Sequence, residues 1–261
     1  MTFSNIFKYG LVEAYSMLSS TKSTTALALK IIAIALCCLI GYFLGSINFA
    51  IIISKHKHDD VRTHGSKNAG ATNMLRTYGK KAALLTFAGD FLKAIVSCFI
   101  GGLLFGHSGL YLAGLFCVLG HIFPIFYKFK GGKGVATIAG VMCFGNVGAF
   151  LVVFALYAGV FMTSKYVSLA SVMCAFMYPF ILNRMNVLFR IPNDIHVIFA
   201  LAMSILIIIK HIPNINRIFN QTEPKTYLSK KKRAEYKAEQ EKKAEAQSKS
   251  KNKKSLHNED D

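Results

Sequence analysis

Residues 134–162 read GVATIAGVMCFGNVGAFLVVFALYAGVFM, a run of 29 residues without one charged side chain. A helix needs about 20 apolar residues to cross a hydrocarbon core of about 30 Å, so the run is too long for one ordinary span. Gly145, Asn146 and Gly148 interrupt its middle. We therefore expect two short membrane helices that meet around residues 144–148, a break that persists at membrane depth only where protein packs around it.

The rest of the chain carries the same apolar signal. Five further apolar stretches are bounded by polar or charged residues, at residues 26–54, 82–105, 110–126, 166–182 and 195–209. Hydrophobic residues make up 53% of the sequence and charged residues only 17%, which excludes an ordinary cytosolic enzyme and a disordered protein. The sequence predicts an all-α polytopic membrane protein with about seven transmembrane helices.

Basic residues set the expected orientation. Lys and Arg gather in segments 55–81 and 128–133 and in the C-terminal tail, whereas the turn at 106–109 has none. Loops rich in Lys and Arg stay in the cytoplasm, so we expect the N-terminus outside and the C-terminus inside. An even number of spans must then separate residue 134 from the tail, which also requires the break in the long apolar run. The net charge of +18 fits this lipid-facing pattern, and no nucleic-acid partner is expected.

Composition divides the chain into an N-terminal extension (1–25), a membrane domain (26–223) and a basic tail (224–261). The tail is rich in Lys, Glu, Ala and Ser with few apolar residues, so we expect it to be disordered. The six cysteines all lie in apolar stretches without a C-x-x-C pair. This pattern favours buried thiols over disulfides or a metal site.

The first basic segment contains RTHGSKNAGATNMLR at residues 62–76. Glycines allow successive backbone N–H groups to turn toward one point, hydroxyl and amide side chains add neutral donors, and the arginines at both ends add charge. These are the components of a phosphate cradle. A flexible connection between helices would have a similar composition, so this loop alone leaves both interpretations open.

A second glycine-rich loop favours the phosphate interpretation. Residues 120–137 read GHIFPIFYKFKGGKGVAT, in which Lys133 lies among glycines just before the long apolar run. Helix N-termini attract anions, and an ammonium group can neutralise them. No Ser or Thr follows Lys133 as in a Walker A motif, so ATP hydrolysis is disfavoured. A third polar segment, with Asn214, Arg217 and Glu223, is expected on the same face, where the three segments would bind two phosphate groups.

Two ionisable residues, Asp90 and Lys93, lie within the 82–105 stretch at positions i and i+3. An intramembrane charge indicates a function by default, but a structural ion pair is an equal alternative at this spacing. His121, close to Pro124, is expected to be structural or orienting rather than catalytic.

Motifs at five places along the chain resemble the bacterial acyl-phosphate:glycerol-3-phosphate acyltransferase (PlsY) family, over roughly residues 26–225. They are Gly45-Ser46; Arg62-x-x-Gly65-Ser66-x-Asn68-x-Gly70-Ala71-Thr72-Asn73-x-x-Arg76; Asp90-x-x-Lys93; Gly120-His121-x-Phe123-Pro124 with Phe129-Lys130-Gly131-Gly132-Lys133-Gly134-Val135-Ala136-Thr137; and His211-x-x-Asn214-Ile215-x-Arg217 with Glu223. The sequence departs from the family at Lys67 and Gln221, where glycine is usual. The resemblance implies transfer of a fatty acyl group from acyl phosphate to the 1-hydroxyl of glycerol 3-phosphate, giving lysophosphatidic acid and phosphate.

The resemblance also implies roles for individual residues. Catalytic roles are expected for Ser46, Lys133, His211 and Asn214. Phosphate or substrate binding is expected of Arg62, Gly65, Ser66, Asn68, Gly70, Thr72, Asn73, Arg76, Gly131, Gly132, Gly134, Arg217 and Glu223, and an orienting role of Asp90, Lys93 and His121. We expect no cofactor and no metal, a bacterial plasma-membrane location with the active site at the cytoplasmic face, and a functional link to an enzyme that makes acyl phosphate.

An acyl phosphate already has a good leaving group, so such an enzyme needs mainly proximity and charge neutralisation. Acyltransferases that use thioesters carry His-x-x-x-x-Asp, and none of the eight histidines here has Asp five positions on. A phosphate oxygen of the substrate would then accept the hydroxyl proton. The alternative function is a membrane transporter for phosphate esters or organic anions, with basic cytoplasmic gates.

Overall fold

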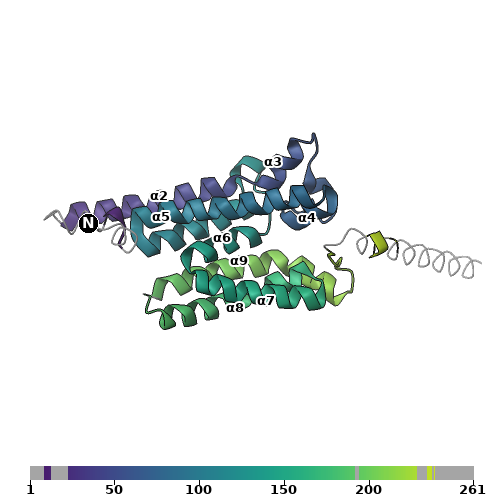
Figure 1. Cartoon of the computed structure of the whole chain (residues 1–261). Coiled ribbons are helices and arrows are strands. Elements are labelled where there is room, and N and C mark those ends of the chain that lie inside the picture. Colours follow the sequence, from purple (N-terminus) through teal and green to yellow (C-terminus); the bar gives the residue numbers. More distant parts are fainter. Residues whose placement is uncertain (1–8, 13–22, 192–193, 228–233, 237, 239–261) are drawn as a thin grey trace, which may run out of the picture.

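The computed structural model describes residues 9–12, 23–191, 194–227, 234–236 and 238, and within them the ordered elements are helices (Figure 1). The elements are α2 (Ser23–Ser46), α3 (Phe49–Lys55), η1 (Val61–Thr63), α4 (Ala71–Thr77), α5 (Lys80–Ile122), η2 (Ile125–Tyr127), α6 (Val135–Gly145), α7 (Val147–Ser164), α8 (Val167–Leu188) and α9 (Asp194–Phe219). The described residues contain no strand, which confirms the all-α prediction. Most of the extension and of the tail lies outside the described residues.

Helix α5 folds back on itself. Its backbone leaves helical geometry at Phe105 (φ −139°) and Gly106 (φ 57°), a conformation that glycine adopts without strain. This reversal brings the two arms side by side in antiparallel directions. The Ser97 hydroxyl on one arm donates to the carbonyl oxygen of Ala113 on the other at 3.0 Å. The predicted pair of spans at 82–105 and 110–126 is therefore present, with the reversal at the start of the predicted turn.

The long apolar run is broken where the sequence predicted. Helix α6 ends at Gly145 and α7 begins at Val147, with Asn146 extended between them (φ −157°). The Asn146 side chain accepts from the N–H of Ala149 at 2.9 Å and so caps α7, and it donates to Asn186 at the end of α8. An amide that satisfies the new helix end allows the break to persist inside the membrane.

Five helices are long and apolar enough to cross a membrane, by length and composition, within the described residues. One of them is the folded α5, whose two arms count as two crossings, and the short apolar α6 adds another segment. Together these segments are compatible with the predicted seven spans. The count and the orientation remain predictions.

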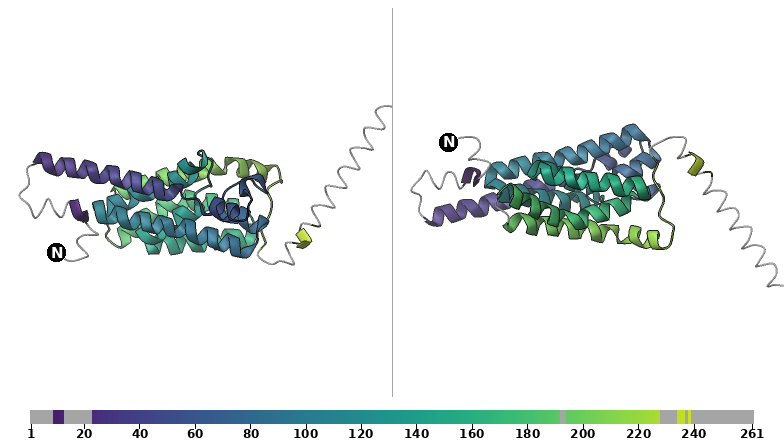
Figure 2. Two further views of the ribbon diagram at one scale, coloured as in Figure 1. Left: turned by 90° about the horizontal axis from the view of Figure 1, so that it is seen from above. Right: turned by 60° about the horizontal axis from the view of Figure 1, so that its bottom comes forward.

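The helices form two layers with α6 between them (Figure 1). Helix α2 packs along α5 on one side, while α7, α8 and α9 pack together on the other. The two views in Figure 2 show the long helices running roughly along one axis, and Figure 1 places α3 and α4 at the end where α9 finishes. The main apolar cluster joins α5 and α6 to α7, α8 and α9, and includes Tyr111, Val141, Tyr178 and Met203.

Close contact between α2 and α5 depends on small residues. A Cβ atom at Gly41 would lie 2.4 Å from the carbonyl oxygen of Ala113, and one at Gly45 would lie 2.1 Å from that of Cys117. In lipid, where the hydrophobic effect between helices is absent, small residues of this kind let backbones approach and gain dispersion energy.

We predict that Gly45→Ala lowers the melting temperature of the detergent-purified protein by about 3 to 10 °C, because the added methyl group overpacks the α2–α5 contact. Gly159→Ala in α7 is the matched control, since a Cβ atom there meets nothing within 4 Å. A thermal-shift assay with a thiol-reactive dye, which becomes fluorescent as unfolding exposes the free cysteines, measures the difference. Equal melting temperatures for the two variants would contradict the tight α2–α5 contact.

Candidate active site

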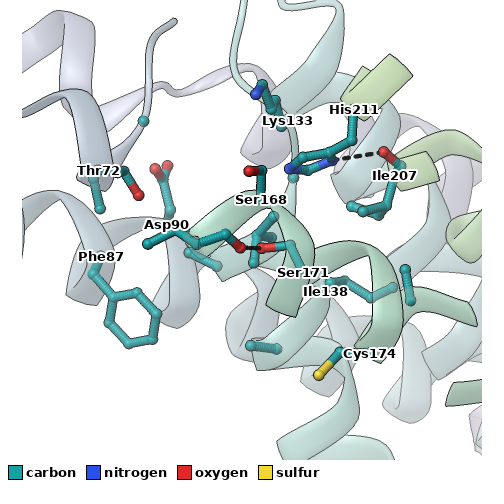
Figure 3. Close-up of a pocket in the computed structure, with 18 of the residues that line it drawn as sticks. Thr72, Phe87, Asp90, Lys133, Ile138, Ser168, Ser171, Cys174, Ile207 and His211 are labelled. Atoms are coloured by element: carbon teal, nitrogen blue, oxygen red, sulfur yellow. Dashed lines mark hydrogen bonds between the residues drawn. The ribbon is translucent and has the colours of Figure 1, made fainter. Parts of the chain in front are cut away.

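A cavity of about 360 Å³ lies between the two layers. Residues from α4, α5, α6, α7, α8 and α9 and from three loops line it. Figure 3 shows Thr72, Phe87 and Asp90 on one side of this pocket and Lys133 and His211 on another. The lining therefore brings together segments that are more than 100 residues apart in the sequence.

The cavity has a polar end and an apolar end. The polar residues come from all three predicted segments and from the start of α8: Ser66, Asn68, Thr72, Asn73, Arg76, Lys133, Ser168, His211, Asn214 and Glu223. The apolar lining comes mainly from α5, α6, α7 and α8: Phe87, Phe91, Ile138, Ala139, Met142, Phe150, Val153, Phe154, Tyr157, Cys174 and Ala175. Such a cavity can hold a molecule with a charged head and a hydrocarbon chain.

The carboxylate of Glu223 is the centre of the polar end. It is 6% exposed and accepts hydrogen bonds from the Asn214 amide (2.7 Å), the Ser168 hydroxyl (2.8 Å) and the Arg217 guanidinium (2.7 Å). Burial alone would raise the pKa of this carboxyl, but the three donors and the Arg217 charge outweigh it and lower the pKa below its usual range. Glu223 therefore stays ionised and holds the segment after α9 against α8.

Lys133 points to this cluster. Its ammonium donates to the side-chain oxygen of Asn214, whose amide in turn donates to Glu223. Burial lowers the pKa of Lys133 to about 8, and the nearby Glu223 carboxylate only partly opposes this shift. A partly desolvated ammonium at the polar end is well suited to bind a phosphate oxygen.

The glycines beside Lys133 fix its base. The N–H groups of Gly131 and Gly132 donate to the carbonyl oxygens of Ile122 (3.2 Å) and His121 (3.1 Å). A Cβ atom on Gly132 would lie 2.2 Å from the His121 ring, so only glycine fits. These two amides were expected to face a phosphate, whereas in the structure they close the loop on which Lys133 stands. Gly134 lines the cavity with φ 85° at the start of α6.

The first loop keeps its shape through Asn73. Its side-chain oxygen accepts from the N–H of Ser66 at 3.0 Å, and its amide nitrogen donates to the carbonyl oxygens of Val61, His64 and Asn68 at 3.0 to 3.1 Å. Asn73 is 1% exposed. This one side chain folds residues 61–73 into a compact turn and holds Ser66 and Asn68 at the cavity.

Lys67 and Gln221 both have left-handed backbone conformations, with φ 56° and 57°. Glycine occupies this region freely, while other residues pay about 1 kcal/mol or more. The backbone conformation at positions 67 and 221 is thus one that the expected glycine would adopt without strain. Lys67 itself is exposed and does not line the cavity.

Arg76 anchors the segment that follows α9. Its guanidinium donates to the carbonyl oxygen of Pro224 (3.1 Å) and to the hydroxyl of Thr226 (3.0 Å), and the N–H of Thr226 donates to Lys165 (2.9 Å). Together with the bonds of Glu223, these contacts tie residues 223–226 across α4, α8 and the α7–α8 turn. Arg76 also lines the cavity.

Asp90, Lys93 and His121 form a buried cluster beside the cavity. Lys93 pairs with Asp90 at 2.7 Å, contacts the His121 ring nitrogen at 3.0 Å, and donates to the carbonyl oxygens of Gly45 (2.9 Å) and Ile47 (2.6 Å). The ammonium thus caps the end of α2. The geometry agrees with an orienting ion pair that joins α2 to both arms of α5, and Asp90 and His121 also reach the cavity lining.

Seven predicted site residues do not line the cavity: Ser46, Arg62, Gly65, Lys93, Gly131, Gly132 and Arg217. Ser46 is fully buried and donates to the carbonyl oxygen of Tyr42 in its own helix at 2.8 Å. Arg62 pairs with Asp60 at 2.7 Å, and this hydrogen-bonded pair lowers the pKa of the Asp60 carboxyl. Ser46 thus bonds within its own helix, and Arg62 contacts the carbonyl oxygens of Tyr127 and Lys130 outside the cavity.

The sequence reading missed Ser168 and Ser171. Both line the cavity from the first turns of α8, and Ser168 bonds directly to Glu223. Their signal was available as two hydroxyls spaced i and i+3 on an otherwise apolar span. Small hydroxyls are common in membrane helices, so the spacing alone does not separate them from packing residues.

Among the described residues, no group of three or more His, Cys, Asp or Glu side chains is arranged to hold a metal ion. The six cysteines are free thiols.

A family model described as glycerol-3-phosphate acyltransferase matches residues 35–221. The chain belongs to the glycerol-3-phosphate acyltransferase family. Among similar curated proteins, the glycerol-3-phosphate acyltransferase of Finegoldia magna is 41% identical over 192 residues, covering 72% of this chain and 93% of its own. That of Bacillus subtilis is 40% identical over 193 residues, covering 74% and 97%.

Two solved structures of PlsY (YgiH), an integral membrane glycerol 3-phosphate acyltransferase, are similar to this fold. The glycerol 3-phosphate form aligns with a TM-score of 0.68 and 37% identity over 74% of this chain and 96% of that chain. The lysophosphatidic acid form aligns with 0.66 and 36%, over 75% and 96%. The chain is accordingly a membrane-embedded member of an acyltransferase family.

We predict that Lys133→Ala lowers the acyltransferase kcat/KM by about ten- to a hundredfold or more, because a charged hydrogen bond in a partly desolvated site contributes about 1.5 to 3 kcal/mol. Lys67→Ala should change it less than about threefold, since the Lys67 ammonium is exposed. Initial rates of the purified variants at subsaturating substrate measure both. Comparable rates for Lys133→Ala and the wild type would remove Lys133 from the site.

The lowered pKa of Lys133 predicts an alkaline limit. The ammonium is present below about pH 8 and is lost as the pH rises through that value, so the wild-type kcat/KM should fall above about pH 8. In Lys133→Arg the guanidinium stays charged, so the residual kcat/KM of this variant should not fall above pH 8. A pH profile of both proteins, corrected for spontaneous donor hydrolysis, tests this. If kcat/KM fell above pH 8 in the same way for both proteins, a group other than Lys133 would be responsible for the fall.

Proposed function

We propose that this protein transfers a fatty acyl group from acyl phosphate to the 1-hydroxyl of glycerol 3-phosphate, which gives lysophosphatidic acid and phosphate. The observation that carries the proposal is the cavity itself, whose cationic, hydrogen-bonding end continues into an apolar end. One substrate of this reaction is a small phosphate ester, and the other joins a phosphate to a long hydrocarbon chain.

The polar end supplies what two phosphates require. Lys133 and Arg76 contribute positive charge, and Ser66, Asn68 and Thr72 contribute neutral donors from the first loop. Charge-assisted hydrogen bonds to phosphate are among the strongest available to side chains. A solved relative is described in a glycerol 3-phosphate form, which supports this substrate for the same family.

The apolar end suits the acyl chain. Along α6 its lining extends from Val135 to Met142, two residues that lie about 10 Å apart along the helix. Tyr157, Phe154 and Phe150 line it from α7 over a similar length. We infer that the carbonyl end of the donor lies at the level of Lys133 and that the chain runs between α6 and α7.

The reaction needs no protein base in this proposal. The 1-hydroxyl oxygen attacks the acyl carbonyl carbon, the bond from that carbon to the phosphate oxygen breaks, and a phosphate oxygen takes the hydroxyl proton. The Nδ1 atom of His211 contacts the carbonyl oxygen of Ile207 at 2.8 Å and that of His121 contacts Lys93, and these contacts orient the two rings. Proximity and neutralisation of the phosphate charges by Lys133 then supply the acceleration.

We further propose that the protein resides in the bacterial plasma membrane with the cavity's polar end at the cytoplasmic face. Basic residues gather on the loops that carry this end, in agreement with the positive-inside rule. Both substrates would then arrive from the cytoplasmic side, and an enzyme that makes acyl phosphate is the expected functional partner. The transporter alternative is less favoured because a transporter needs a polar path across the membrane, whereas aromatic residues such as Phe91, Phe150 and Phe154 line this cavity.

The donor assay tests the chemistry. Purified protein with glycerol 3-phosphate should form lysophosphatidic acid from palmitoyl phosphate, with rates at least about a hundredfold lower from palmitoyl-CoA or palmitoyl-acyl-carrier protein, because only acyl phosphate carries a phosphate leaving group directly on the acyl carbon. Lys133→Ala protein sets the background. A faster reaction with either thioester would overturn the proposed donor while leaving the acyltransferase family intact.

Cysteine labelling tests the orientation. In intact cells, a membrane-impermeant maleimide should fail to label Lys67→Cys and should label it after permeabilisation. Ser108→Cys, in the turn predicted to lie outside, is the matched control and should be labelled in intact cells. Labelling of position 67 from outside would invert the proposed topology.

A further inference from the structure

The loop between α5 and α6 ends in an exposed, apolar and basic tip. Phe126 is 57% exposed and Phe129 is 56% exposed, and Ile125, Lys128 and Lys130 are exposed beside them. We call these five residues the loop tip. A soluble surface rarely groups large apolar side chains in this way, and such a patch generally marks an interaction site.

The base of this loop is rigid. The paired bonds from Gly131 and Gly132 to the end of α5 close it, and the N–H of Phe129 donates to the carbonyl oxygen of Pro124 at 2.9 Å. The Tyr42 hydroxyl of α2 donates to the carbonyl oxygen of Phe123 at 2.8 Å. The tip is therefore held in a fixed position outside the helix bundle.

The tip lies beside the end of a candidate membrane helix, α2. Phe126 packs on Phe43 of α2, with ring centroids 6.2 Å apart, and Phe43 is 45% exposed one turn before α2 ends at Ser46. Helix α2 belongs to the candidate span Thr24–Lys55, and basic residues begin at Lys55, so we infer that this part of the span approaches the headgroups. Aromatic side chains are enriched at this depth.

Basic residues predominate in and around the tip. Residues 120–134 contain three lysines, one histidine and no Asp or Glu. Two further ammonium groups lie over aromatic rings of the same loop, Lys210 over Phe123 at 5.3 Å and Lys55 over Tyr127 at 5.4 Å. An anionic partner fits this surface.

We propose that the loop tip binds anionic phospholipids, with Ile125, Phe126 and Phe129 inserted between lipids and with Lys128 and Lys130 on the headgroup phosphates. Amphipathic segments bind membranes through such buried apolar side chains together with attraction to anionic lipid. The position next to the lipid-facing end of α2 favours a lipid surface over a partner protein as the occupant. This inference does not depend on the acyl donor.

The sequence provides a clean spectroscopic test, because the protein contains no tryptophan. Phe126→Trp therefore introduces a single fluorophore at the tip. The variant is reconstituted in nanodiscs of phosphatidylcholine that contain a minor fraction of phosphatidylglycerol. Tryptophan fluorescence should be quenched more when the phosphatidylglycerol carries brominated chains than when the same fraction of phosphatidylcholine carries them. Excess inorganic phosphate should not remove the difference, since the proposed ligand is a lipid and not free phosphate.

Lysine variants separate specific binding from bulk lipid contact. Each lysine near an anionic surface contributes about fivefold in binding, so Lys128→Gln with Lys130→Gln should reduce the phosphatidylglycerol preference by at least about fivefold. Lys80→Gln with Lys81→Gln, at the start of α5, removes the same charge from another exposed site and should leave it unchanged. Equal quenching by both lipids in the Phe126→Trp protein would overturn the proposal, and no quenching by either would show that the tip meets water or a protein partner instead.

Discussion

The buried carboxylate of Glu223 is the interaction on which the polar end of the molecule depends. A buried charge is costly unless it is paired and hydrogen-bonded, and Glu223 meets both conditions through Ser168, Asn214 and Arg217. These partners belong to the start of α8 and the end of α9, so one carboxylate fixes the relative position of two helices. Through Asn214 the same group orients the ammonium of Lys133, which comes from the loop before α6. The segment that follows α9 therefore both lines the cavity and fixes the positions of the polar side chains around Lys133.

This arrangement explains why two helix layers share one cavity. The first layer brings the loop folded by Asn73 and the buried cluster of Asp90, Lys93 and His121, while the second brings Ser168, His211 and Asn214. The short α6 lies between the layers (Figure 1), and several of its apolar residues line the cavity. Each layer contributes both polar and apolar residues to the lining of this cavity. A site at the junction of the layers can therefore hold a charged group and a lipid chain together.

The sequence predicted the helical membrane fold, the hairpin of α5 and the break at Asn146, because these depend on local apolar patterns and on the parity of basic loops. It also indicated most of the polar lining, since Lys133, Asn214 and Glu223 lie in short motifs. It did not indicate that Gly131 and Gly132 bond to the end of α5, that Ser46 is buried against its own helix, or that Ser168 reaches Glu223. Those contacts join residues far apart in the chain or depend on side-chain direction, and no local pattern encodes them.

The central claim is that Lys133 and Glu223 act as one unit through Asn214. A double-mutant cycle on kcat/KM tests it most directly, with Lys133→Ala, Glu223→Gln and the double variant, each first shown to be monodisperse in detergent. Residues in one hydrogen-bonded network are coupled, so the double variant should lose little more activity than the worse single variant, a coupling of about 1 to 3 kcal/mol. Losses that simply multiply would mean that Glu223 and Lys133 act independently, and would contradict the account.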